Sequence, residues 1–124
     1  MLKDYLKIYI TGLFFIYAGI AHFTNPDFYL ELIPSYLPFH KFLVDSSGVL
    51  EIIGGMLLFF NKTRFLGVYI INILLVLFFV IHIDMFLNFQ FFENIVLNKL
   101  AMTLRLVIQV LLIYFINSFK SINL

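Results

Sequence analysis

The stretch FLGVYIINILLVLFFVI, at residues 65–81, carries no charged side chain. As an α-helix it would be about 25 Å long, close to the hydrocarbon thickness of a bilayer, about 30 Å. Three further apolar blocks accompany it, separated by polar or proline-rich segments. We therefore expect an all-α, polytopic membrane protein, a four-helix bundle whose transmembrane helices cover about residues 5–22, 42–60, 64–83 and 100–117.

The composition supports the membrane class. Of the 124 residues, 63% are hydrophobic and 12% are charged, whereas soluble domains average about 45–50% and about 25%. A soluble chain of this length could not bury so much apolar surface in one core. The absence of cysteine excludes disulfides and thiolate metal sites, and a net charge of +1 without a basic cluster gives no indication of nucleic-acid binding.

Residues 24–41 join the first two predicted spans and contain all three prolines of the chain. Prolines interrupt long helices, but Asn25 before Pro26 favours the start of a short one. Aromatic side chains such as Tyr36 suit the headgroup layer of the membrane. We expect a proline-rich interfacial loop that lies along the membrane surface as a lid over the bundle.

The N-terminal block admits a second interpretation, because basic residues followed by an apolar run are also typical of a signal peptide. We expect this block to be retained as the first span. Four crossings place both termini and the turn at residues 61–64 on one side, with five basic residues there against two on the other. The positive-inside rule then predicts that both termini are cytoplasmic.

Ionisable side chains are rare inside membranes, because each costs about 2.5–3.5 kcal/mol near the middle of the bilayer. Counting about 1.5 Å per residue from the ends of the predicted spans places polar residues from all four spans in one layer near the outer face. This candidate polar cluster comprises His22, Glu51, His82, Arg105 and Gln109, with Tyr36 of the loop on the same side.

Small residues indicate that this polar cluster faces other helices rather than lipid. Gly48 and Gly54 lie on the helix face of Glu51, and Gly19 lies on the face of His22. Glu51 and Arg105 have opposite charges and similar depths, so we expect them to form an ion pair.

Three interpretations of the polar cluster stay open. Buried polar groups can fix the register of packed helices, or they can line a pocket that opens outward. In the third, His22 and His82 hold a metal ion or the iron of a haem. We expect no metal, because the chain has no His-x-x-x-His pair and His82 and Asp84 fall on different helix faces.

Several motifs occur in the order and spacing of one known family. They are FIYAGIAHF at 15–23, SGVLEIIG at 47–54, the basic turn at 62–64 and RLVIQ at 105–109. Together they resemble the DoxX-like family of small membrane proteins over roughly residues 10–115. The resemblance implies a four-helix protein of the bacterial inner membrane, in a family named after a subunit linked to thiosulfate and quinone oxidoreduction. The chain departs from that pattern at Val107, where members often have proline, and at residues 79–81, where they often have Pro-Ala-Asn.

These observations favour an accessory, non-catalytic membrane subunit that binds a small molecule, a lipid headgroup or a quinone in the outward pocket. One alternative is a quinone-linked oxidoreductase subunit in which His22 or His82 donates protons. Another is a purely structural subunit. The expected partners are the lipid bilayer and a membrane complex or a second copy of the chain, and a hydrolase is disfavoured because no nucleophile and base are arranged together.

Overall fold

All regular structure in residues 2–33, 35–88 and 94–121, which the computed structural model describes, is helical. The elements are α1 (Leu2–Thr24), α2 (Pro26–Leu32), α3 (His40–Leu57), α4 (Arg64–Asn88), α5 (Ile95–Asn117) and the short 3-10 helix η1 (Ser118–Ser121). The predicted all-α class is therefore confirmed.

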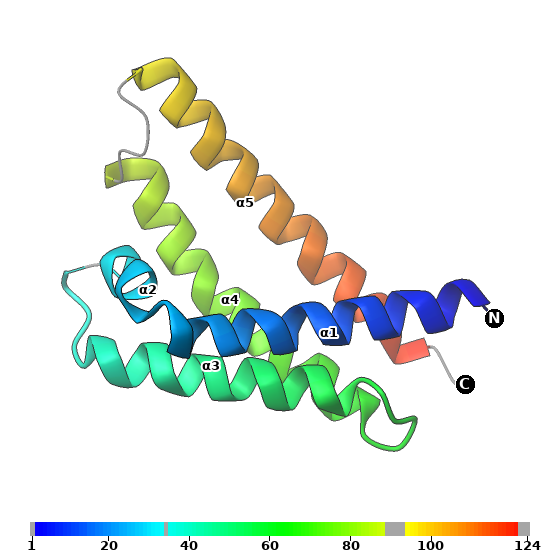
Figure 1. Cartoon of the computed structure of the whole chain (residues 1–124). Coiled ribbons are helices and arrows are strands. Elements are labelled where there is room, and N and C mark those ends of the chain that lie inside the picture. The colour runs from blue at the N-terminus through cyan, green and yellow to red at the C-terminus, as the bar shows by residue number, and fades with distance from the viewer. Residues whose placement is uncertain (1, 34, 89–93, 122–124) are drawn as a thin grey trace.

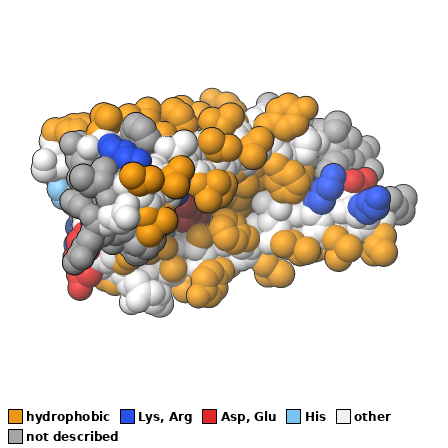
Figure 2. All heavy atoms as spheres, turned by 90° about the horizontal axis from the view of Figure 1, so that it is seen from above, with side chains coloured by type: hydrophobic (Ala, Val, Ile, Leu, Met, Phe, Trp, Pro, Cys, Tyr) orange, Lys and Arg blue, Asp and Glu red, His pale blue; other side chains and the backbone are white. Residues whose placement is uncertain are grey.

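Three of these helices are long and apolar enough to cross a membrane: Leu2–Thr24, Arg64–Ile81 and Val96–Asn117. The remaining long helix, α3, has 18 residues and carries Lys41, Asp45 and Glu51, and it is not among them. Figure 2 shows hydrophobic side chains over the middle of this face, with a recessed acidic patch among them, and the other charged side chains towards its two ends. The protein is thus a multi-pass helical membrane protein in contact with the lipid bilayer.

The chain runs up and down, so that its connections gather at two ends (Figure 1). One end, the turn end, holds both termini and the turn between α3 and α4. The other, the lid end, holds α2, the last turns of α4 and the first turns of α5. The short turn at residues 58–63 makes α3 and α4 antiparallel neighbours, as its length predicts.

Glycines set the contact between α1 and α3. A methyl group on Gly19 would lie 2.5 Å from the carbonyl oxygen of Gly48, and one on Gly55 would lie 2.7 Å from that of Gly12. These two antiparallel pairs, seven residues apart on each helix, let the backbones touch directly. A third contact joins α3 to α4, where a methyl group on Gly67 would lie 2.8 Å from the Gly54 carbonyl oxygen.

Residues from α1, α4, α5, η1 and the turn after α3 form the core at the turn end: Ile8, Phe15, Leu58, Val68, Ile71, Leu75, Ile116 and Phe119. Polar contacts add to the packing of α5 on α4. The amides of Asn72 and Asn117 exchange two hydrogen bonds, of 2.9 and 3.2 Å. The Gln109 amide donates to the Leu75 carbonyl oxygen at 2.6 Å. The hydrogen bonds between Asn72 and Asn117 were not predicted from the sequence.

The helices are longer than three of the four predicted spans. α1 extends beyond the predicted span 5–22 at both ends, α4 continues past residue 83, and α5 begins before residue 100. The early start of α5 has a local cause, because the Asn94 side chain accepts a hydrogen bond from the Leu97 amide as an N-cap, at 3.1 Å. The predicted short helix in the proline-rich loop is α2, with Pro26 in its first turn.

Candidate functional site

A cavity of about 520 Å³ opens among the helices towards the lid end. We call it the interhelical cavity. Its walls are mainly apolar side chains of α3 and α4, including Leu50, Leu74, Leu77, Phe78 and Ile81. Its polar lining comprises His22, Tyr29, Ser46, Ser47, Glu51 and Arg105. This volume falls in the range of small-molecule sites, about 300–1,000 Å³.

His22 and Glu51 meet in the wall of this cavity. His22 Nε2 lies 3.3 Å from Glu51 Oε2, and the two side chains are only 7% and 6% exposed. Both residues come three positions after a glycine of the α1–α3 contact, Gly19 and Gly48, so the close backbone approach brings them together. The contact has ion-pair distance but not hydrogen-bond geometry, and Glu51 Oε2 has no hydrogen-bond partner among the described residues.

The contacts of Nδ1, the other ring nitrogen of His22, indicate which tautomer the imidazole adopts. Nδ1 lies 2.9 Å from the Val44 carbonyl oxygen, which can only accept, so Nδ1 carries a hydrogen. The Ser47 hydroxyl donates to the same carbonyl oxygen at 3.0 Å and lies 3.1 Å from Nδ1. A neutral imidazole would therefore turn a lone pair towards the carboxylate. Adding one proton to either group removes this unfavourable contact, because the pair then carries either two opposite charges or none.

Helix α2 covers this pair. The ring of Tyr29 lies over the His22 imidazole, with centroids 4.1 Å apart and planes tilted by 34°. Burial, and after it the nearby Glu51 carboxylate, raises the pKa of the Tyr29 phenol above its usual range. The phenol is therefore a neutral O–H group at physiological pH, and α2 forms an aromatic lid on the cavity.

The predicted polar cluster is only partly brought together. His22, Glu51 and Arg105 line the interhelical cavity. Gln109 is buried but bonds to the α4 backbone outside the cavity lining, and Tyr36 is exposed and also lies outside it. The backbone of His82 lies in α4, but its side chain lies outside the described residues.

The predicted ion pair between Glu51 and Arg105 is wrong. Among the described residues, the charged or chargeable nitrogen within 4.0 Å of the Glu51 carboxyl group is that of His22. The reason is the order of the helices: α3 packs on α1 and α4, whereas α5 packs on α4 and η1. Arg105 therefore reaches the cavity from the α5 side, and His22 takes the place beside the carboxylate.

Sequence reasoning missed Tyr29, Val44 and the polar role of Ser47. Ser47 lies one helical turn before Glu51 and was placed on its face as a small residue, but not as a hydrogen-bonding group beside the histidine. The carbonyl oxygen of Val44 carries no sequence signal. In the part of the chain that is described, no three histidine, cysteine or acidic side chains gather as they would around a metal ion.

Fold and site together define a small multi-helix membrane protein with a largely apolar cavity and a buried histidine–carboxyl pair. The chain belongs to the family of the domain of unknown function DUF8561, which matches residues 11–120. Neither the curated proteins nor the solved structures include a significant match to it.

Proposed function

We propose that this protein is an accessory membrane subunit of the DoxX-like kind that binds a small lipophilic molecule in the interhelical cavity. The observation that carries the proposal is the Glu51 carboxyl group, which is buried in the wall of an apolar cavity and whose Oε2 accepts no hydrogen bond from any described residue. Such an atom costs free energy unless a donor meets it. The ligand is an amphiphile whose head group donates a hydrogen bond, such as a phenol or a quinol.

The proposal includes a fourth crossing by α3. Helices α1 and α4 both begin at the turn end (Figure 1), so the chain must return there between them. α3 runs that return path and is the longest element between α1 and α4. Its Lys41 and Asp45 form an exposed ion pair at 3.3 Å near its start, which suits the interface, and Glu51 is matched by His22.

With four crossings, both termini lie on the side that is rich in basic residues, in the cytoplasm of a bacterium with this protein in its inner membrane. The interhelical cavity then lies in the outer half of the bilayer under α2. Lipophilic ligands would reach it from the membrane, and Arg105 places a positive charge in the same cavity as the head group.

A purely structural role has one observation in its favour, since the His22–Glu51 contact joins α1 to α3 and could serve only to fix their register. The glycine contacts already specify that register, however. The open volume beside the pair is not needed for packing, so ligand binding accounts for more of the site.

The test compares thermal unfolding of the purified protein with and without a short-chain quinol, alongside native mass spectrometry of gently extracted protein. The Leu77→Trp variant places an indole in the cavity, and Leu104→Trp is its matched control, because both leucines are 58% exposed but only Leu77 lines the cavity. We expect the quinol to stabilise the native protein and the control but not Leu77→Trp. Equal stabilisation of all three, or of none, would overturn the proposal for this ligand.

A further inference from the structure

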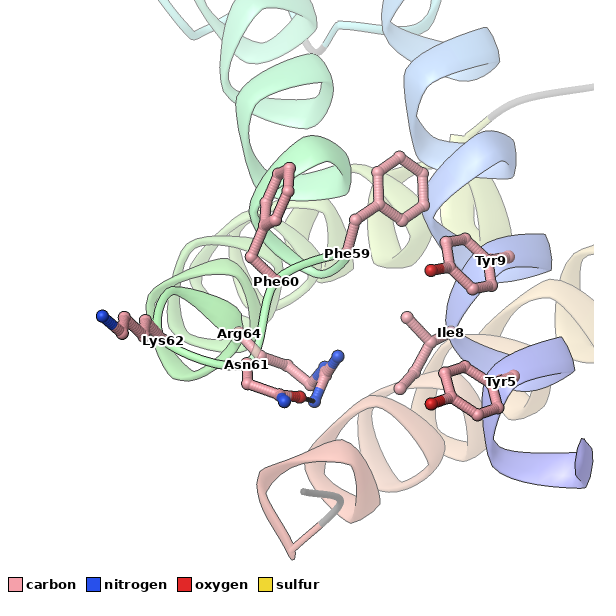
Figure 3. Close-up of a pocket in the computed structure, with 8 residues that line it drawn as sticks. All are labelled: Tyr5, Ile8, Tyr9, Phe59, Phe60, Asn61, Lys62 and Arg64. Carbon is pink, nitrogen blue, oxygen red and sulfur yellow. Dashed lines mark hydrogen bonds between the residues drawn. The ribbon is translucent and has the colours of Figure 1, made fainter. Parts of the chain in front are cut away.

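A second cavity, of about 380 Å³, lies at the turn end of the bundle (Figure 3). We call it the turn-end cavity. Its lining comes from two places in the chain, the first two turns of α1 and the turn between α3 and α4. It is separate from the interhelical cavity and shares no lining residue with it.

One wall of the turn-end cavity is a stack of aromatic rings. Tyr5 and Tyr9 stack with centroids 6.2 Å apart, and Tyr9 stacks on Phe59 at 5.3 Å. Both tyrosine hydroxyls point towards the turn in Figure 3. Among the described residues, neither hydroxyl takes part in a hydrogen bond. The wall therefore offers two O–H donors above an apolar surface.

The opposite wall carries a fixed positive charge. Arg64 is 4% exposed, and its guanidinium donates to the Leu58 carbonyl oxygen at 2.8 Å and to the Asn61 side-chain oxygen at 2.7 Å. These bonds hold the guanidinium between the turn and the tyrosines (Figure 3), while Lys62 points away. No acidic side chain is among the described residues that line the cavity, so these residues give it a positive charge, with the two tyrosine hydroxyls on the opposite wall.

The position of the cavity matches the headgroup layer of a membrane. Tyr5 and Tyr9 lie near the start of a span that begins at Leu2, where tyrosines meet the membrane–water interface. Phe60 lines the cavity and is exposed, so it adds apolar surface to the cavity. An acyl chain could follow this surface while a headgroup occupies the cavity.

We propose that the turn-end cavity binds the phosphate of an anionic phospholipid, with Tyr5 and Tyr9 donating hydrogen bonds to its oxygens and Arg64 supplying the positive charge. Charge-assisted hydrogen bonds are stronger than neutral ones, so two hydroxyls facing one phosphate give appreciable affinity. Because no carboxylate occurs among the described lining residues, they offer no counter-charge for the ammonium group of a zwitterionic lipid. Selectivity for phosphatidylglycerol over phosphatidylcholine follows.

The test follows the unfolding midpoint of the full chain in a neutral detergent during titration with phosphatidylglycerol, phosphatidylcholine or inorganic phosphate. Only phosphatidylglycerol should raise the midpoint. The Tyr5→Phe/Tyr9→Phe variant keeps both rings and removes both hydroxyls, so its affinity should fall about ten-fold for each lost bond to the charged group. The matched control, Tyr69→Phe/Tyr114→Phe, changes two exposed tyrosines of α4 and α5 and should bind like the native chain.

The unfolding midpoint without lipid verifies that the variant folds. Unchanged affinity in Tyr5→Phe/Tyr9→Phe would overturn the proposal. So would an equal response to phosphatidylcholine, because the charge of the lipid would then be irrelevant. A response to inorganic phosphate of the same size would show a site for free anions and would overturn the lipid assignment.

Discussion

The side chains of His22 and Glu51 are almost fully buried, at 7% and 6% exposed, so the free energy of folding depends on whether each group keeps its partner. Removing one member of a buried pair leaves the other uncompensated, at a cost of about 3–5 kcal/mol, whereas replacing both with apolar residues is often neutral. His22 retains its Val44 and Ser47 contacts when the carboxylate is lost, but Glu51 Oε2 has no second partner among the described residues. The two single substitutions should therefore be unequal.

We predict that His22→Ala destabilises the protein by about 3 kcal/mol and that Glu51→Leu destabilises it by about 1 kcal/mol. The double variant should be more stable than His22→Ala alone, because it contains no buried unpartnered carboxyl group. Unfolding free energies of the four proteins, measured in one detergent, form a double-mutant cycle. Strictly additive losses would contradict coupling between the two side chains.

At this scale the sequence predicted that His22 and Glu51 face the interior of the bundle, because small residues on the same helix faces are visible in the chain itself. It did not predict that the two residues touch. Counting residues along each span gives a depth in the membrane but does not show which helices are neighbours. The guanidinium of Arg105 was therefore predicted to pair with the Glu51 carboxylate, because their charges are opposite. Because α1 packs on α3 whereas α5 packs on α4, it is His22 of α1 that lies beside the Glu51 carboxyl group.

Among the elements, α1 and α3 form the tightest pair, and their glycines should respond unequally to a methyl group. At Gly19 the new atom would meet the Gly48 carbonyl oxygen at 2.5 Å, and that backbone atom cannot move aside without parting the helices. At Gly54 it would first meet a side-chain carbon of Ile71 at 2.9 Å, which can adjust. Alanine also favours the helix over glycine by about 1 kcal/mol.

We predict that Gly19→Ala destabilises the protein by about 1–3 kcal/mol, the usual range for overpacking, while Gly54→Ala stays within about 1 kcal/mol of the native protein. Thermal unfolding in detergent measures both. Equal losses of stability at Gly19 and Gly54 would contradict this prediction, because the cost of the methyl group would then not depend on whether it meets backbone or side chain.

The helices themselves were largely predictable, because apolar runs and the short turn at 58–63 are local features. Their ends were less so. The prediction ended the third span at about residue 83, yet α4 continues to Asn88. A hydropathy boundary marks where the membrane-compatible segment stops, whereas a helix continues as long as its backbone hydrogen bonds are made. The cap at Asn94 similarly lies outside any apolar run.

For the whole molecule, the number of crossings decides where both cavities lie. Three helices qualify as spans by length and composition, and α3 must either cross with them or lie along a membrane surface. An odd number of crossings would separate the termini, which lie at the same end of the bundle in Figure 1. The buried His22–Glu51 contact and the glycine pairs with α1 would also be lost if α3 left the bundle.

We predict that a cysteine at position 35 is labelled from outside the cell and one at position 62 from the cytoplasmic side. The chain has no native cysteine, so Ser35→Cys and Lys62→Cys each carry a single reporter, and both residues are exposed and flank α3 in the chain. A membrane-impermeant maleimide applied to intact cells and to inside-out vesicles measures their sidedness, and Lys3→Cys should label like Lys62→Cys. If α3 lay on the surface, positions 35 and 62 would be labelled from the same side, and the interhelical cavity could not be an outer-leaflet site enclosed by α1, α3 and α4.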